Sequence, residues 1–236
     1  MKKSILALSL ATLLFNGCGS SSTGNGSSNQ DLGTVPTSVT DAITAPKSTL
    51  TQELQDSITY MHSEERLAYD VYSNVYKMRS VKQLTNIATN AETTHITKVN
   101  ELAVKYDLNI TRYPDTNTPY STNDATRYAS GTYPVSPIQD LYNVLYDKGI
   151  QSDKDALEVG CMVEVVDIDD LLKYISQAQT SNASDVVTIF EFLRDGSYKH
   201  YWSFDKGLKN MGVSTGCCSV APYGGHTFCH PEYPNN

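Results

Sequence analysis

The sequence predicts an all-α fold in which four long helices pack as one bundle. Four stretches carry apolar residues at steps of three and four, and this spacing places them on one face of a helix. Polar or charged residues interrupt each apolar stripe near its middle. Two short connections and one long connection join the stretches. The stripes are Leu54, Ile58, Met61, Glu65, Ala68, Tyr72; Leu84, Ala88, Glu92, His95, Val99, Leu102; Leu157, Gly160, Glu164, Asp167, Leu171, Ile175; and Val186, Phe190, Leu193, Ser197, His200, Phe204.

The first two predicted helices are joined closely. The first covers about residues 51–77 and contains no proline. Ser80 and Gln83 have the spacing of a capping box, which predicts that the second helix begins there and runs to about residue 106.

The second pair of helices follows a long connection. Its prolines predict loop up to a Ser-Pro step, which opens a short helix over about residues 138–148. Ser152 and Asp155 predict a capped third helix over about 153–178. The fourth begins at Ser184 or Asp185 and ends near residue 210.

The connection lengths predict the topology. Short links make antiparallel neighbours of helices one and two, and of helices three and four. A crossover of about 45 residues, containing the short extra helix, separates the two pairs; one such crossover is the ferritin-like four-helix arrangement. The bundle is predicted to span residues 51–212. Because the polar interruptions all lie near mid-helix, they are predicted to meet at one level.

The N-terminus predicts export. Residues 1–17 have a positive start and a short apolar segment, as in a signal peptide. Phe15-Asn16-Gly17-Cys18 is similar to a lipoprotein cleavage box, which predicts lipidation of Cys18; the alternative is an ordinary secretory signal with a chance cysteine. The apolar segment is too short to span a bilayer.

Residues 18–50 are predicted to be the lipidated cysteine and a flexible Gly/Ser/Thr-rich tether. The predicted location is therefore the cell envelope, with the lipid anchor in the membrane. In a Gram-negative cell the residues after Cys18 favour the outer membrane. The net charge of −8 excludes a nucleic-acid partner, which needs a basic surface. A small-molecule or protein partner is not identified.

The polar residues of the stripes predict a metal site. Glu92 and His95 form an E-x-x-H motif, which puts a carboxylate and an imidazole side by side on one helical turn. Glu65 and Glu164 fit the role of single glutamates from other helices, and His200 fits that of a second histidine. A buried cluster of such groups is costly unless it is paired or bound to metal.

One position departs from the di-iron pattern. Ser197 stands three residues before His200, where a glutamate is expected. Asp167, one turn after Glu164, is predicted to supply the missing oxygen ligand. The predicted ligands are Glu65, Glu92, His95, Glu164, Asp167 and His200. Iron, as one ion or as a di-iron pair, is favoured, with manganese or zinc as alternatives.

Other polar residues receive supporting roles. Tyr72 and Tyr201 are predicted to flank the site, together with Ser197. Asp70 lies off the stripe and is predicted to form a cap or a pair. His62 also lies off the stripe and is predicted to be at the surface, and Glu64 is predicted to turn away from the site.

Several of these segments resemble a known family. They are residues 63–72 (SEERLAYDVY), Glu92-x-x-His95, Glu164-x-x-Asp167-Ile168, and Gly196-Ser197 with His200 three residues later. Over about residues 51–210 the chain is similar to the bacterial ferritin-like family described as domain of unknown function 2202. The resemblance implies a ferritin-like bundle with a metal site, and it implies no particular reaction.

The C-terminal tail, residues 213–236, carries cysteines and histidines: Cys217, Cys218, His226, Cys229 and His230. Disulfides are the usual state of cysteines in exported proteins, so Cys229 is predicted to pair with Cys217 or Cys218. The alternative is a zinc or copper site in the tail. Cys161, beside the third stripe, is predicted to pack as a small apolar residue.

Two function classes follow. The first is an envelope lipoprotein that uses bound metal for redox chemistry or metal handling. The second is a non-catalytic, lipid-anchored binding module whose buried polar network holds no metal. Whether the protein is an enzyme is left open by the sequence.

Overall fold

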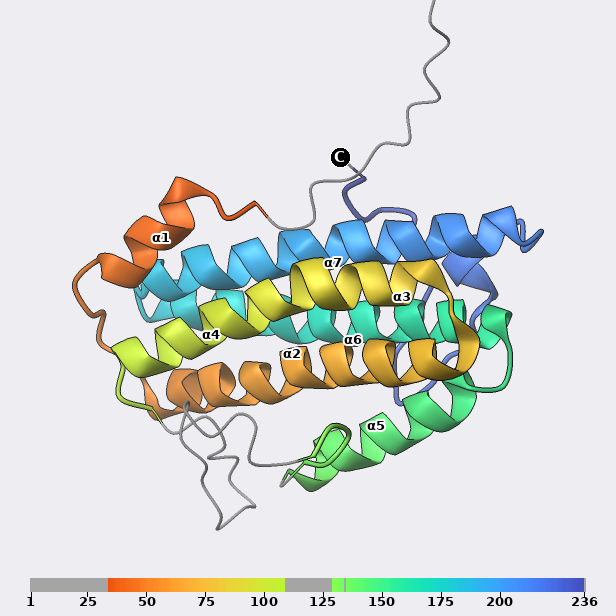
Figure 1. The fold of residues 1–236 in the computed structure, drawn as a ribbon. Helices are drawn as coiled ribbons and strands as arrows, with labels where there is room; N and C mark the ends of the chain where they lie inside the picture. Colours follow the sequence, from red (N-terminus) through yellow and green to blue (C-terminus); the bar gives the residue numbers. More distant parts are fainter. Residues whose placement is uncertain (1–33, 109–128, 134, 236) are drawn as a thin grey trace, which may run out of the picture.

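The computed structural model describes residues 34–108, 129–133 and 135–235, and this part of the chain is helical with connecting loops (Figure 1). The prediction of an all-α fold is confirmed, since the described residues contain no strand beyond one isolated bridge. The helices are α1 (Thr37–Thr44), α2 (Gln52–Arg79), α3 (Lys82–Ile87), the π-helix η1 (Ala88–Glu92), α4 (Thr93–Lys105), α5 (Ser136–Gly149), α6 (Asp153–Thr180), α7 (Ser184–Asn210) and the 3₁₀ turn η3 (Gly216–Ser219).

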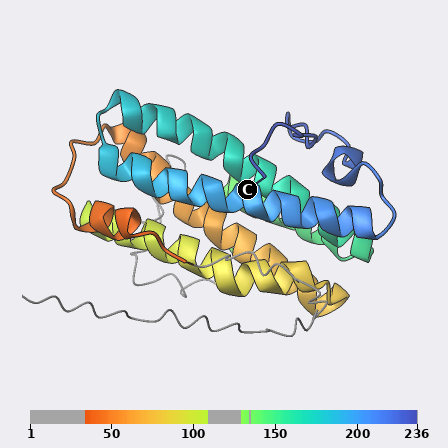
Figure 2. The same ribbon diagram turned by 90° about the horizontal axis from the view of Figure 1, so that it is seen from above.

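Four long helical segments lie side by side (Figures 1 and 2). They are α2, the continuous run from α3 through η1 to α4, α6 and α7. The helices α6 and α7 pack closely along their lengths, α5 contacts α2 and α6, and α1 contacts α7. All 24 residues of the four predicted stripes are buried.

The apolar core is divided into two clusters. One contains residues from the start of α2, the end of α4, the end of α6 and the start of α7, among them Ile58, Leu102 and Phe190. The other contains residues from the second half of α2, from α3 and η1, from the first half of α6 and from the end of α7, among them Tyr72 and Phe204. On α2, on the run from α3 to α4 and on α7, the polar residues of the stripes lie between these clusters in sequence. On α6, Glu164 and Asp167 lie where the second cluster ends, just before the first cluster begins at Leu171, so the polar residues of all four segments lie near the middle of the core.

The helix ends confirm one predicted cap and correct another. The Ser152 hydroxyl accepts a hydrogen bond from the backbone N–H of Asp155, 3.0 Å away, at the start of α6. Ser80 does not cap α3: it adopts a left-handed φ of 54° and ends α2, and its N–H donates to the Tyr76 carbonyl. The chain reverses within two residues here, and a left-handed residue makes that reversal possible.

Part of the segment predicted as a flexible tether, residues 18–50, is folded. Within its second half, α1 buries Val39 and Ala42 against the neighbouring helices. The Lys105 ammonium donates to the Ala42 carbonyl at 2.8 Å, and the Ser48 hydroxyl donates to Asp185 at 2.7 Å. The segment from Thr34 onward is therefore attached to the helical core.

The predicted signal peptide and Cys18 lie outside the described residues. Among the described residues, no helix is at once long and apolar enough to cross a membrane.

Asp70 forms a pair, as predicted, and it also fixes the crossover. Its carboxylate accepts hydrogen bonds from the Ser130 hydroxyl at 2.7 Å, the Gly131 N–H at 2.9 Å and the Tyr133 hydroxyl at 2.7 Å. The Arg66 Nε lies 3.6 Å from the same carboxylate. These contacts hold the end of the crossover against α2.

The tail is bound by two disulfides. Cys218 pairs with Cys229, which is one of the two pairings left open by the sequence. Cys217 pairs with Cys161, so the prediction that Cys161 is a simple packing residue is wrong. All four cysteines of the described chain are thereby oxidised, which removes the thiolate ligands that a zinc or copper site in the tail would need.

His62 is fully buried, and the prediction of a surface position is wrong. α2 contacts α4, α5 and α6, so its buried face is wider than the single stripe that the sequence shows. Burial, together with the charge of Arg66, lowers the pKa of His62 to about 3.

We expect His62 to make the fold sensitive to mild acid. In the unfolded chain His62 takes up a proton near pH 6.5, whereas in the folded chain it does not. The free energy of unfolding is therefore unaffected by His62 above pH 6.5 and decreases as the pH drops from 6.5 toward 3. The slope is about 1.4 kcal/mol per pH unit. Between pH 7 and pH 5, wild type should lose about 2 kcal/mol more than His62→Gln in urea unfolding. Equal losses would show that His62 is not buried in its neutral form.

Candidate metal centre

Five predicted ligands come from the middle of all four long helical segments. Glu65 lies on α2, Glu92 ends η1, His95 lies on α4, Glu164 on α6 and His200 on α7. All five side chains are buried, none more than 3% exposed. They form two groups whose candidate ligand atoms lie within 4.8 Å of one another.

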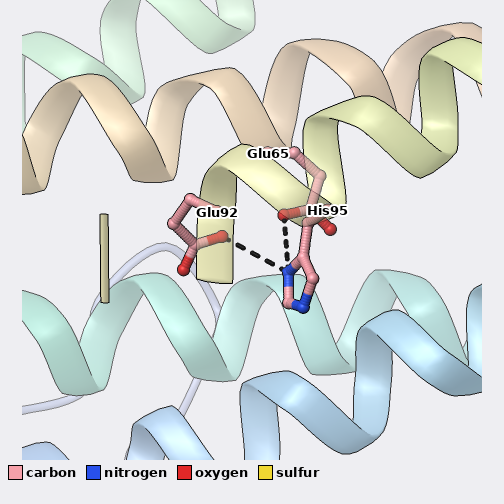
Figure 3. Close-up of side chains that lie close together, drawn as sticks. All are labelled: Glu65, Glu92 and His95. Carbon is pink, nitrogen blue, oxygen red and sulfur yellow. Dashed lines mark hydrogen bonds and ion pairs between the residues drawn. The ribbon is translucent and has the colours of Figure 1, made fainter. Parts of the chain in front are cut away.

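The first group, called the Glu65 group, consists of Glu65, Glu92 and His95. The Nδ1 atom of His95 lies 3.1 Å from Oε2 of Glu65 and 3.3 Å from Oε2 of Glu92 (Figure 3). The two carboxylates approach the imidazole from different helices, so the side chains converge on one point between α2 and α4.

The second group, called the Glu164 group, consists of Glu92, Glu164 and His200. The Nδ1 atom of His200 lies 3.2 Å from Oε1 of Glu92 and 3.3 Å from Oε2 of Glu164. The imidazoles of His95 and His200 are stacked, with centroids 5.4 Å apart. Glu92 therefore turns one oxygen to each group and is shared by both.

The π-helix positions the shared glutamate. The sequence predicts one unbroken helix from the Ser80–Gln83 capping box to about residue 106, but η1 inserts a wider turn over Ala88–Glu92. Such turns add a residue to the helical repeat and are frequent at functional sites. Here the wide turn ends at Glu92, and His95 follows in the first turn of α4.

Asp167 and Ser197 form a pair beside the two groups. The Ser197 hydroxyl donates to Oδ2 of Asp167 at 2.6 Å and also lies 3.1 Å from the Leu193 carbonyl. Asp167 belongs to neither group. The serine that replaces the expected glutamate thus holds a carboxylate from the adjacent helix α6.

The two tyrosines have different positions. The Tyr72 hydroxyl donates to Oε1 of Glu164 at 2.5 Å, so Tyr72 does flank the site as predicted. Tyr201 does not: its hydroxyl donates to the Phe228 carbonyl at 3.1 Å and accepts from the His230 N–H at 3.0 Å. Although Tyr201 follows His200 in sequence, it faces the C-terminal tail, because successive residues of a helix point about 100° apart.

The pKa values of the buried carboxyl and imidazole groups shift in different directions. Burial raises the pKa of Glu65 to about 7, although the His95 charge opposes that rise. For Glu92, burial is outweighed by His200 and His95, which hold its pKa well below the usual range. Burial lowers the pKa of His200, but Glu164 and Glu92 more than compensate and raise it to about 9. The pKa of Asp167 rises well above its usual range because of burial and then the charge of Glu65.

The donor set fits a metal ion. Within the described chain no hydrogen bond reaches two buried carboxylate oxygens of the site, Oε1 of Glu65 and Oδ1 of Asp167. Buried polar atoms without partners are costly, and a bound cation would satisfy them. Carboxylate oxygens with imidazole nitrogens suit iron, manganese or zinc.

A pocket of about 290 Å³ adjoins the two histidines. It lies between the start of the described chain and α7, and its lining includes Val39, Glu191, Lys199, His95 and His200. Both histidines of the two groups thus line one side of this pocket.

The sequence reasoning missed Glu64. It is predicted to turn away from the site, yet it is buried, and burial and the charge of Asp170 raise its pKa well above the usual range. The doubled glutamate at residues 64 and 65 is the one sequence signal for it, and the stripe does not include it.

The chain is similar to a protein family and to a relative whose structure is solved. The family described as "Uncharacterized protein domain (DUF2202)" matches residues 54–220. The uncharacterized protein MJ0754 of Methanocaldococcus jannaschii is 34% identical over 167 residues, covering 71% of this chain and 81% of that protein. The crystal structure of hypothetical protein MJ0754 from Methanococcus jannaschii is similar with a TM-score of 0.60 and 32% identity, covering 71% of this chain and 86% of that one.

That relative is archaeal, so the comparison does not support the bacterial restriction in the predicted resemblance. The family match itself covers the four long helical segments and the first disulfide. The chain therefore belongs to the family described as Uncharacterized protein domain (DUF2202).

Proposed function

We propose that the protein is a ferritin-like four-helix bundle that binds one or two metal ions, with iron favoured, for redox chemistry or metal handling. The observation that carries the proposal is the shared Glu92 carboxylate, which joins two buried glutamate–histidine groups at the middle of four helices. Two helical hairpins joined by one long crossover are the ferritin-like arrangement.

The two groups define which residues would hold metal. Glu65, Glu92 and His95 would form one site, and Glu92, Glu164 and His200 the other, with Asp167 beside them. Iron bound there would supply one-electron redox chemistry.

Residues around the two groups would orient the metal ligands. Tyr72 orients Glu164 by a hydrogen bond, and Ser197 orients Asp167. The histidines, protonated between carboxylates without metal, would release protons on binding.

Metal analysis tests the proposal directly. Protein purified without chelator is assayed for iron, manganese and zinc by mass spectrometry, and apoprotein is titrated with each ion during thermal unfolding. A ligand that binds only the folded state, present at a concentration 100 times its dissociation constant, adds about 2.7 kcal/mol to the free energy of unfolding. We expect one or two ions per chain and a higher melting temperature. Absence of both effects for all three metals would reject the proposal.

The second candidate is a non-catalytic binding module with a buried hydrogen-bond network. Ser197 favours it, because a serine replaces a common metal-binding carboxylate. The same titration separates the two candidates, since a closed polar network would show no metal-dependent stabilisation. Neither candidate assigns a reaction or a partner.

We further propose that the mature protein is a lipoprotein anchored to a membrane through Cys18. The support is the order of a positive start, an apolar segment and Cys18 in the sequence. Cys18→Ser should move the protein from the membrane to the soluble fraction, and the lipid mass should be lost. A Cys18→Ser protein that stays in the membrane fraction would contradict the anchor.

A further inference from the structure

Gly196 is located in the interior of α7, four residues before His200. A Cβ atom built on it would lie 2.5 Å from Nε2 and 2.7 Å from Cε1 of His95. Real Cβ atoms essentially never come so close, so the His95 ring occupies the space that any other residue at 196 would fill. The backbone of α7 and the imidazole of α4 are therefore in direct contact.

The backbone conformation gives no other reason for this glycine. Gly196 is not among the residues with positive φ, so any residue could adopt its helical geometry. Glycine in a helix interior is unfavourable relative to alanine. A close approach by a neighbouring group is the usual explanation for such a glycine, and His95 makes that approach.

The His95 ring has little freedom to move away. Its Nδ1 atom contacts Glu65 and Glu92 at 3.1 and 3.3 Å, and its face stacks on His200. The Phe192 ring packs edge-on, with centroids 5.8 Å apart. A methyl group at 196 would push the ring toward the carboxylates, which are already at contact distance, so the ring would have to rotate.

We propose that Gly196 is a positioning residue that sets the orientation of the His95 imidazole and thereby the geometry of the Glu65 group. The inference rests on the proposed function, because the group is positioned for metal. Residues that orient a ligating histidine typically change metal affinity 10- to 100-fold when mutated.

The test is Gly196→Ala in the full chain. We expect its affinity for the ion held by the Glu65 group to fall about 10- to 100-fold. This affinity is measured by competition with a chelator of known affinity. The matched control is Gly207→Ala in the same helix. A Cβ there would lie 2.9 Å from Cδ2 of Leu157 and 3.0 Å from Nε2 of Gln83, both flexible ends outside the centre, so it should retain wild-type metal affinity.

A double-mutant cycle with His95→Ala separates positioning from general damage to α7. With the imidazole removed, the space opposite residue 196 is open. Gly196→Ala should then leave the affinity of the remaining Glu164 group unchanged. It should also raise the urea midpoint of the metal-free protein, because alanine favours the helix. In the wild-type background the same substitution should lower that midpoint.

The outcomes are distinct. If wild type binds metal and Gly196→Ala binds it with unchanged affinity, or if Gly207→Ala loses as much, the positioning role is wrong while the proposed function stands. The same holds if the effect of Gly196→Ala is equal with and without His95. If wild type binds none of iron, manganese and zinc, the proposed function fails and the positioning of a metal ligand fails with it.

Discussion

Glu92→Gln should remove metal from both groups at once. Glu92 gives one carboxylate oxygen to the His95 side and the other to the His200 side, so its loss breaks both sets of ligands. The amide keeps the size of the side chain but loses the negative charge that a divalent ion needs. We expect metal content near zero and no metal-dependent rise in melting temperature.

The single-group variants give the comparison. Glu65→Gln and Glu164→Gln each alter one group, so each should retain about half of a two-ion content. Glu158→Gln is a control for loss of a buried carboxylate elsewhere: Glu158 is buried on α6 but pairs with Lys148 and Lys154. If Glu92→Gln kept as much metal as Glu158→Gln, the shared-ligand arrangement would be wrong.

Removal of the Cys161–Cys217 disulfide should cause the largest loss of stability. The bond joins α6 to η3 across a sequence separation of 56 residues. Closing a loop of that length lowers the entropy of the unfolded chain and stabilises the fold by about 4 kcal/mol. Cys161→Ala/Cys217→Ala should therefore unfold at markedly lower urea concentration, measured with metal-free protein.

The second disulfide is the matched comparison. Cys218 and Cys229 are 11 residues apart, so their removal should cost less, about 3 kcal/mol. An equal or larger loss for Cys218→Ala/Cys229→Ala would show that loop entropy does not govern the stability of this tail. Reduction without mutation should reproduce the summed effect.

The sequence by itself determined the four long helical segments and showed that their polar residues lie near mid-helix. A periodicity of three and four needs only local geometry, so the four stripes, the Ser152 cap and the mid-helix positions of Glu65, Glu92, Glu164 and His200 could be predicted. Each position depends on which face of one helix is apolar, and the residues of that helix show this directly.

Tertiary structure decided the contacts between helices. The burial of His62 and Glu64 depends on the neighbouring helices that enclose α2, and the apolar stripe of α2 does not record them. Cys161 finds Cys217 only when η3 folds back against α7, and cysteine spacing cannot specify a partner that far along the chain.

The arrangement of the centre also needed the fold. The π-turn that ends at Glu92 adds a residue to one turn of helix, and hydrophobic spacing does not reveal it. The packing of α7 against α4 decides how close Gly196 lies to His95. The sequence thus identified the residues that could bind metal. Only the packing of four helices determined that Glu92 is shared between the Glu65 group and the Glu164 group. Sharing depends on distances between side chains of different helices, and no local sequence pattern encodes those distances.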